Sequence, residues 1–237
     1  MSLPATPPRP HNNRLLAALP REDVARLLPQ LTPVPLALGD VLYEPDRPMA
    51  YLYFPTTAVV SLVYTMVDGT TAEMGLVGNE GVVGVALFMG GDTTPNRAIV
   101  QVAGDAFRLW APALRAEFLR AGAVQLALLR YTQALITQIS QTAVCNRLHA
   151  IEQRLCRWLL LTRDRVPSDA IQMTQEFIAH MLGVRREGVT LAARHLQEAG
   201  LIRYVRGHIT VLDRPGLEAT VCECYRVVKD EFTRLLG

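Results

Sequence analysis

The sequence predicts an α+β protein in three parts: an N-terminal antiparallel, jelly-roll-like β-roll, a long helix, and a small C-terminal domain of short helices and strands. Three observations predict this architecture. Residues 31–109 consist of short β-prone runs, residues 113–165 have the apolar spacing of helices, and residues 173–212 change from helical to strand periodicity. Half of the 237 residues are hydrophobic, which is enough apolar material for packed cores.

The N-terminal residues are not expected to fold. The first ten contain four prolines and no apolar run of a signal peptide, so we predict a disordered tail at residues 1–14, no export and a cytoplasmic protein. Residues 48–67 carry no charge and are long enough to suggest a membrane span. Their prolines and their Tyr, Thr and Val content favour short strands instead, so we expect no membrane contact.

Residues 15–110 are expected to form the β-roll. The predicted strands lie at 41–43, 50–54, 59–67, 72–76 and 99–103, each bounded by Pro, Gly or Asp. Gly recurs every three residues from Gly75 to Gly84, a spacing that is neither a dinucleotide fingerprint nor a P-loop. The loop at 89–97 has the composition of a ligand-binding loop, because small polar residues and Arg97 could hold an anion. A solvated Arg97 explains the loop equally well.

Residues 111–147 are expected to form a linker and a long dimerisation helix. One stripe of side chains recurs at alternating spacings of three and four, which is typical of a coiled-coil seam. The predicted dimer seam consists of Leu128, Tyr131, Leu135, Gln138, Thr142 and Cys145. A second face is lined by Leu129, Ile136 and Ile139, so one face should dock on the β-roll and the other on a twin helix. The polar Gln138 and Thr142 could set the register or touch a ligand held between subunits.

Residues 148–237 are expected to form a helix-turn-helix domain. After a core helix at 148–162, Thr174 is a good N-cap for a helix at 175–182, and Gly183 can end that helix in a left-handed conformation. A second helix follows from 184 to Gly200. Two short helices joined by a Gly turn match the arrangement that places the start of the second helix in a DNA major groove.

A β-hairpin, or wing, is predicted directly after the second helix. Two β-prone runs at 201–205 and 208–212 bracket the turn residues Arg206 and Gly207. Between Arg185 and Arg206 there are five Arg and two Glu, whereas the whole chain has a net charge of only +2. Positive charge is therefore concentrated where a phosphate backbone would lie. Asp213 is expected to cap one last helix that continues to Leu236.

The cysteines and histidines do not suggest a metal site. Cys222 and Cys224 fall on the last predicted helix, where residues two apart point to nearly opposite sides, so we expect them neither to chelate nor to form a bridge. The five His residues are scattered along the chain. No metal ligand is assigned, and a thiol-based redox response is left open.

The order of these parts resembles the Crp/Fnr family of bacterial transcription regulators over residues 15–236. The specific part is QRLCRWLL followed by MTQEFIAHMLGVRRE, and the resemblance continues through GVTLAARHLQEAGLIRY. The β-roll matches more loosely, and VGNEGVVG is similar to one large subgroup of the family. The resemblance implies a sequence-specific DNA-binding transcription regulator that is not an enzyme. It further implies a homodimer that binds a palindromic operator, works with RNA polymerase and senses a small-molecule effector or other signal through the β-roll.

The resemblance also implies DNA-contacting residues. The family's base-reading Arg and Glu fall on Arg186 and Glu187, and the full set of implied DNA-binding positions is Thr174, Gln175, Arg185, Arg186, Glu187, Thr190, Arg206 and His208. Arg can pair with guanine O6 and N7, and Glu can accept from cytosine N4. The family's second recognition Arg is Leu191 in this chain, so its operator should differ from the family's common one.

The family's cyclic-nucleotide cassette is not intact in this sequence. Its Gly-Glu pair aligns with Gly84 and Val85, and a valine side chain cannot accept a ribose hydroxyl. The phosphate-binding Arg aligns near Arg97. The candidate effector pocket consists of Gly84, Val85, Arg97, Ala98, Gln138 and Thr142. Cyclic AMP is not expected as the ligand, nor is an iron–sulfur cluster, because the family's N-terminal Cys cluster is absent; the cofactor is unknown.

Two other classes of protein compete with this interpretation. A small-molecule-binding module or cupin-like enzyme could use the same β-roll, but cupin chemistry needs clustered His and carboxylate ligands, and residues 31–109 contain no His. A protein-interaction adaptor with a degenerate winged helix-turn-helix would lack the steep salt dependence that phosphate contacts give to DNA binding.

Overall fold

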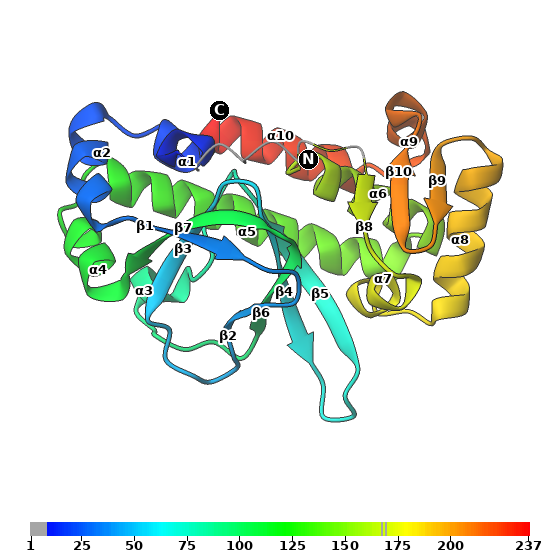
Figure 1. Cartoon of the computed structure of the whole chain (residues 1–237), viewed down its shortest axis with the longest axis horizontal. Helices are drawn as coiled ribbons and strands as arrows, with labels where there is room; N and C mark the ends of the chain where they lie inside the picture. Colours follow the sequence, from blue (N-terminus) through cyan, green and yellow to red (C-terminus); the bar gives the residue numbers. More distant parts are fainter. Residues whose placement is uncertain (1–8, 167, 169) are drawn as a thin grey trace, which may run out of the picture.

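The computed structural model describes residues 9–166, 168 and 170–237. The long helix α5 (Ala123–Leu148) runs along most of the molecule, with the β-roll toward one end and the C-terminal domain at the other (Figure 1). Most of the predicted tail, residues 1–8, lies outside the described part. From residue 10 onward the chain is folded, contrary to the prediction, because the buried Asn13 amide donates to the carbonyls of Pro55 and Gly81 at 2.9 Å each.

The β-roll consists of two antiparallel sheets. The first has the order β1-β7-β3, with β1 at Thr32–Leu36, β7 at Gly104–Trp110 and β3 at Tyr51–Pro55. The second has the order β2-β6-β4-β5, with β2 at Val41–Tyr43, β6 at Arg97–Val102, β4 at Val59–Thr65 and β5 at Thr71–Val77. The five predicted strands are present as β2 to β6, whereas β1 and β7 were missed because Pro33, Pro35 and charged residues interrupt their apolar pattern.

Short helices surround the two sheets. They are α1 (Arg14–Ala17), α2 (Arg21–Leu27), α3 (Ala86–Met89) and α4 (Ala111–Leu119), the last of which leads into α5. The core between the sheets and α5 contains Leu52, Leu109 and Tyr131, all fully buried. A Cβ at Gly81 would lie 1.9 Å from the Tyr131 ring, so only glycine lets this loop approach α5 so closely.

The predicted dimer seam is wrong. Its six residues, Leu128, Tyr131, Leu135, Gln138, Thr142 and Cys145, are all buried inside the single chain, against the β-roll and the C-terminal helix. The opposite stripe of α5 is exposed and includes Leu126, Leu129, Ile136 and Val144. Both stripes have helical spacing, and spacing alone does not reveal which of two stripes faces the chain's own core.

The C-terminal domain packs three short strands against helices. It comprises α6 (Ile151–Arg163), β8 (Ala170–Gln172), α7 (Gln175–Leu182), α8 (Arg186–Glu198), β9 (Ile202–Val205), β10 (His208–Val211), α9 (Arg214–Thr220) and α10 (Cys224–Leu236). The strand order is β8-β10-β9. Leu155, Trp158, Leu196 and Ile209 lie in its core. No helix in the described ranges is long and apolar enough to cross a membrane.

The last predicted helix is two helices. Asp213 caps α9 as expected, with its carboxylate accepting from the Gly216 N–H at 3.0 Å. The chain is extended at Val221 (ψ 151°) and then turns into α10. This break lets α10 lie along α5 (Figure 1), where the ring of Phe232 meets that of Tyr131 at a centroid distance of 6.3 Å.

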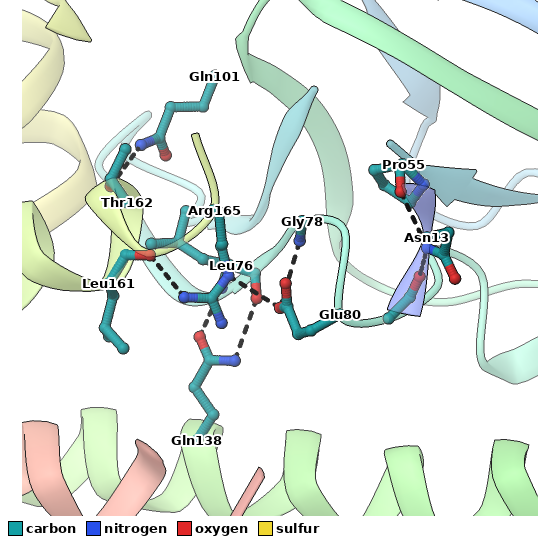
Figure 2. A network of polar contacts seen from close by, with 11 residues as sticks. Asn13, Pro55, Leu76, Gly78, Glu80, Gln101, Gln138, Leu161, Thr162 and Arg165 are labelled. Atoms are coloured by element: carbon teal, nitrogen blue, oxygen red, sulfur yellow. Dashed lines mark hydrogen bonds and ion pairs between the residues drawn. The ribbon is translucent and has the colours of Figure 1, made fainter. Parts of the chain in front are cut away.

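Buried polar contacts join the β-roll to α5 and to the C-terminal domain (Figure 2). The Gln138 side chain accepts from the Leu76 N–H at 2.8 Å and donates to the Leu76 carbonyl at 3.1 Å. Arg165, just after α6, donates to Glu80 at 2.8 Å, and both side chains are buried. Separating the two domains by breaking this buried ion pair would leave a charge buried without its partner, which is unfavourable. The contact therefore helps to fix how the two domains dock.

Candidate nucleic-acid interface

Local signals in the sequence fix the position of α7. The Thr174 hydroxyl accepts from the Phe177 N–H at 3.1 Å, which caps the helix, and α7 spans Gln175–Leu182 as predicted. Gly183 follows with φ +61°, a left-handed conformation that other residues adopt at a cost. The left-handed conformation of Gly183 therefore fixes the direction in which the chain leaves α7 and enters α8.

The N-terminal end of α8 carries two exposed arginines. Arg185 is the N-cap and Arg186 the first helical residue. Helix N-termini disfavour positive charge, because the macrodipole already places partial positive charge there. Within the described ranges no carboxylate lies within ion-pair distance of either guanidinium. Both side chains are therefore available to an external anion or to the acceptor atoms of a base.

The two faces of α8 differ sharply. Val189, Ala192, Ala193 and Leu196, which share one face of the helix, are buried in the domain core. The outer face exposes Glu187, Thr190 and Leu191, the last with 48% of its surface accessible. The Thr190 hydroxyl donates to the Gln175 side chain at 2.7 Å, which ties the outer face of α8 to the start of α7.

The wing is the hairpin formed by β9 and β10. Its turn residues Arg206 and Gly207 have φ values of +50° and +81°, the left-handed pair that a two-residue hairpin turn requires. Arg206 and His208 are exposed. The Tyr204 hydroxyl donates to the Met173 carbonyl at 3.0 Å, so the wing is anchored next to the residue that precedes Thr174.

The eight predicted DNA-binding residues thus come from three adjoining segments: the start of α7, the start of α8 and the wing. Seven of them are exposed and Gln175 is half-buried. Arg203 of β9 is a further exposed arginine beside these segments, and the resemblance to the family did not point to it as a DNA contact.

A groove of about 1160 Å³ lies beside this surface. Arg185, Glu187 and Gly188 line one side of it. The hairpin between β4 and β5, residues 64–72, lines the other side. A Cβ added at Gly183 would lie 3.4 Å from that of Ala72, so the hairpin touches the turn between α7 and α8.

The six predicted effector residues lie on three segments of the chain, and of these Gln138 and Thr142, one turn apart on α5, contact each other. Ala98 is buried in β6, Arg97 pairs with Glu44 at 2.8 Å, and Gly84 packs near Tyr51 and Leu52. Val85 precedes α3, Gln138 is bonded to Leu76, and the Thr142 hydroxyl donates to the Gln138 carbonyl at 2.8 Å. None of five cavities in the described part of the chain is lined by any of the six.

The expectation for Cys222 and Cys224 is corrected. Cys222 precedes α10 instead of lying within it, so helical geometry does not separate the two side chains. Their sulfurs, the Cys145 sulfur and a His149 ring nitrogen lie within 4.8 Å of one another. Local sequence spacing could not show this cluster, because it depends on α10 folding back along α5.

Comparison with known proteins agrees with this geometry. Residues 153–220 match the Crp-like helix-turn-helix domain. FixK2 from Bradyrhizobium japonicum has a TM-score of 0.69 and 17% identity, over 81% of this chain and 98% of that one. Two regulators from Thermus thermophilus are also similar: one of the CRP family (TM-score 0.65, 20% identity, 79% and 95% coverage) and one of the CRP/FNR family (TM-score 0.64, 23% identity, 80% and 97% coverage).

No curated protein sequence matches the chain. The structural similarities, all below 25% identity, show a shared fold, and the match over residues 153–220 identifies the helix-turn-helix within that fold as Crp-like. The chain thus combines a Crp-like helix-turn-helix match over residues 153–220 with a fold that it shares with solved regulators of the Crp/Fnr family.

Proposed function

We propose that the protein is a homodimeric transcription regulator that reads a palindromic operator with the exposed N-terminal end of α8. The observation that carries the proposal is the pair Arg185 and Arg186 at a helix N-terminus, exposed and without an ion-pair partner in the described chain. Two positive charges at a helix N-terminus destabilise the isolated helix. The same charges would be favourable in a site that binds phosphates and the edges of bases.

Arg186 and Glu187 are assigned the base readout. A guanidinium can donate to guanine O6 and N7 together, and a carboxylate can accept from cytosine N4, so each pairing contributes about 1–3 kcal/mol of discrimination. The remaining predicted residues would position the domain on the phosphate backbone. Leu191 is exposed beside them and can offer only an apolar contact, such as one to a thymine methyl.

The proposed dimer uses the exposed stripe of α5. Leu126, Leu129, Gln133 and Ile136 follow one another at the three- and four-residue spacing of a coiled-coil seam, and all four are exposed. Two copies joined along this stripe would present two recognition helices to half-sites about one helical turn apart. DNA, a second copy of the chain and RNA polymerase are thus the proposed partners. The proposed location is the cytoplasm, and the signal sensed by the β-roll is left unassigned.

The test is operator selection from a randomised duplex library with full-length protein, followed by salt-titrated binding to the selected sequence. Arg186→Ala should relax preference at one base pair of each half-site by about 1–3 kcal/mol. Arg226→Ala, which removes an exposed arginine from α10, is the matched control and should leave the preference unchanged. Unaltered preference in Arg186→Ala would refute the readout, and binding insensitive to salt would favour the protein-interaction adaptor.

A further inference from the structure

Four metal-binding side chains meet where α5 ends and α10 begins. Cys145 is in the last turn of α5, and His149 is the residue that ends this helix. Cys222 lies two residues before α10, and Cys224 is its first residue. The three sulfurs and a ring nitrogen lie within 4.8 Å of one another. All three cysteines are buried.

The separations fit a single tetrahedral ion. Cys145 Sγ lies 3.6 Å from Cys222 Sγ, and Cys224 Sγ lies 3.5 Å from His149 Nδ1. With Zn–S bonds of about 2.3 Å and Zn–N bonds of about 2.0–2.1 Å, tetrahedral geometry separates two sulfurs by about 3.8 Å and a sulfur from a nitrogen by about 3.5 Å. The donor set of three thiols and one imidazole is one that structural zinc sites use.

Surrounding groups hold these side chains in place. His149 Nδ1 points to the cluster while its Nε2 lies 3.5 Å from the Glu223 carboxylate, the outer contact that fixes the ring of many metal-bound histidines. The Gln141 amide donates to Cys224 Sγ at 3.2 Å, a bond that favours a sulfur acting as acceptor. If the buried thiols served only as hydrophobic core, neither the Glu223 contact to His149 nor the Gln141 hydrogen bond to Cys224 would be needed.

A buried cation lies close by. Arg157 donates to the Thr142 hydroxyl at 3.2 Å, one turn before Cys145. It makes no ion pair within 4 Å in the described chain, although its charge also acts on the buried Glu73 carboxyl. Its Nε has no hydrogen-bond partner within the described residues. Three thiolates around a divalent ion leave one net negative charge, which this guanidinium can offset.

We propose that Cys145, His149, Cys222 and Cys224 bind one Zn²⁺ per chain, which fastens the start of α10 to the end of α5. Binding would release the thiol protons and stabilise the docking of the C-terminal domain on the long helix. A disulfide between Cys145 and Cys222 would use only two of the four donors, and it would require their sulfurs to approach from 3.6 Å to about 2.05 Å.

The test measures metal in the full-length protein purified under reducing, anaerobic conditions. We expect about one zinc per chain by elemental analysis. After exchange with Co²⁺ we expect intense thiolate-to-cobalt charge-transfer absorption and the visible bands of a tetrahedral ion. Cys222→Ser and Cys224→Ser should lose the tightly held metal. Cys156→Ser, which removes a buried cysteine outside the cluster, should keep it.

Three results would overturn the proposal: no bound metal even with Zn²⁺ added, a Cys145–Cys222 disulfide shown by mass spectrometry, or iron with acid-labile sulfide. Metal retained by both serine variants would also exclude this site. The cobalt spectrum of the unaltered protein reports thiolate ligation even where a variant fails to fold. Because no DNA is used, the result does not depend on the proposed operator readout.

Discussion

Glu73 on β5 is a buried carboxyl group at the contact between the β-roll and α6. Its Oε1 accepts from the indole N–H of Trp158 at 3.1 Å, and its Oε2 has no hydrogen-bond partner among the described residues. Burial raises the pKa of Glu73 to about 7, although the hydroxyl of Ser61 and the charges of Arg157 and Arg165 act in the opposite direction. Near neutral pH this group is therefore close to its titration midpoint.

The stability of the protein should depend on this group between about pH 4.5 and 7. In that window the folded state holds the Glu73 proton more tightly than the unfolded state, so the free energy of unfolding falls as pH rises. Glu73→Gln should remove this part of the slope and stabilise the protein at pH 8 by as much as roughly 3 kcal/mol. Urea unfolding between pH 5 and pH 8 measures the free energy of unfolding of both proteins as a function of pH.

Glu22→Gln, which changes an exposed carboxylate on α2, is the control and should keep the pH dependence of the unaltered protein. An identical slope in Glu73→Gln and the unaltered protein would show that Glu73 titrates as an ordinary carboxyl group.

At the scale of elements, α5 has two apolar stripes with different partners. Tyr131 and Leu135 belong to the stripe that packs on the β-roll, while Leu129 and Ile136 belong to the exposed stripe. Ile136 keeps 55% of its surface exposed in the single chain. A long helix with two apolar faces of which only one is covered is the geometry expected of a subunit interface.

Ile136→Asp should break the proposed dimer. An aspartate in the seam would be desolvated opposite its own copy without a partner, a cost of about 3 kcal/mol or a roughly hundredfold rise in the dimer dissociation constant. Sedimentation equilibrium at micromolar concentration measures this constant. Val227→Asp on α10 replaces a comparably exposed residue outside the stripe and should remain dimeric. A monomeric unaltered protein would exclude the seam altogether.

Local signals made some elements predictable from the sequence. Thr174 and Gly183 fix α7 because a cap and a left-handed residue act within one turn. Arg206 and Gly207 fix the wing in the same way. The seam on α5 and the break at Val221 could not be predicted, because each depends on which distant surface the helix meets. The contact of Cys222 with Cys145 has the same origin.

At the scale of the whole molecule, the β-roll touches the C-terminal domain directly as well as through α5. Gln101 of β6 donates to the Thr162 hydroxyl of α6 at 3.2 Å (Figure 2), and the β4–β5 hairpin contacts the turn at Gly183. Arg185 and Glu187 line the groove whose other side is that hairpin. A duplex that reaches these two residues must enter the groove or displace the hairpin.

Shortening the hairpin should therefore strengthen operator binding. Replacing residues 66–69 with a two-residue turn removes part of the groove wall, and we expect the operator dissociation constant to fall by a factor of at least about 5. Fluorescence anisotropy with a labelled operator measures the change. Shortening the loop at residues 90–94, which is outside the groove, provides the control. Weaker binding by the shortened hairpin would mean that it supports the DNA-bound form.

The contact between Ala72 and Gly183 also has a thermodynamic consequence. Docking of the hairpin and binding of the operator form one closed thermodynamic cycle. Whatever factor docking applies to the operator dissociation constant, operator binding must apply to the docking equilibrium of the hairpin. Backbone amides at 64–72 should accordingly exchange with deuterium faster in the DNA complex than in the free protein. For amides whose exchange requires undocking, with reclosing faster than exchange, the ratio of the two rates gives the same coupling factor as the binding measurement, with no effector needed to reveal it.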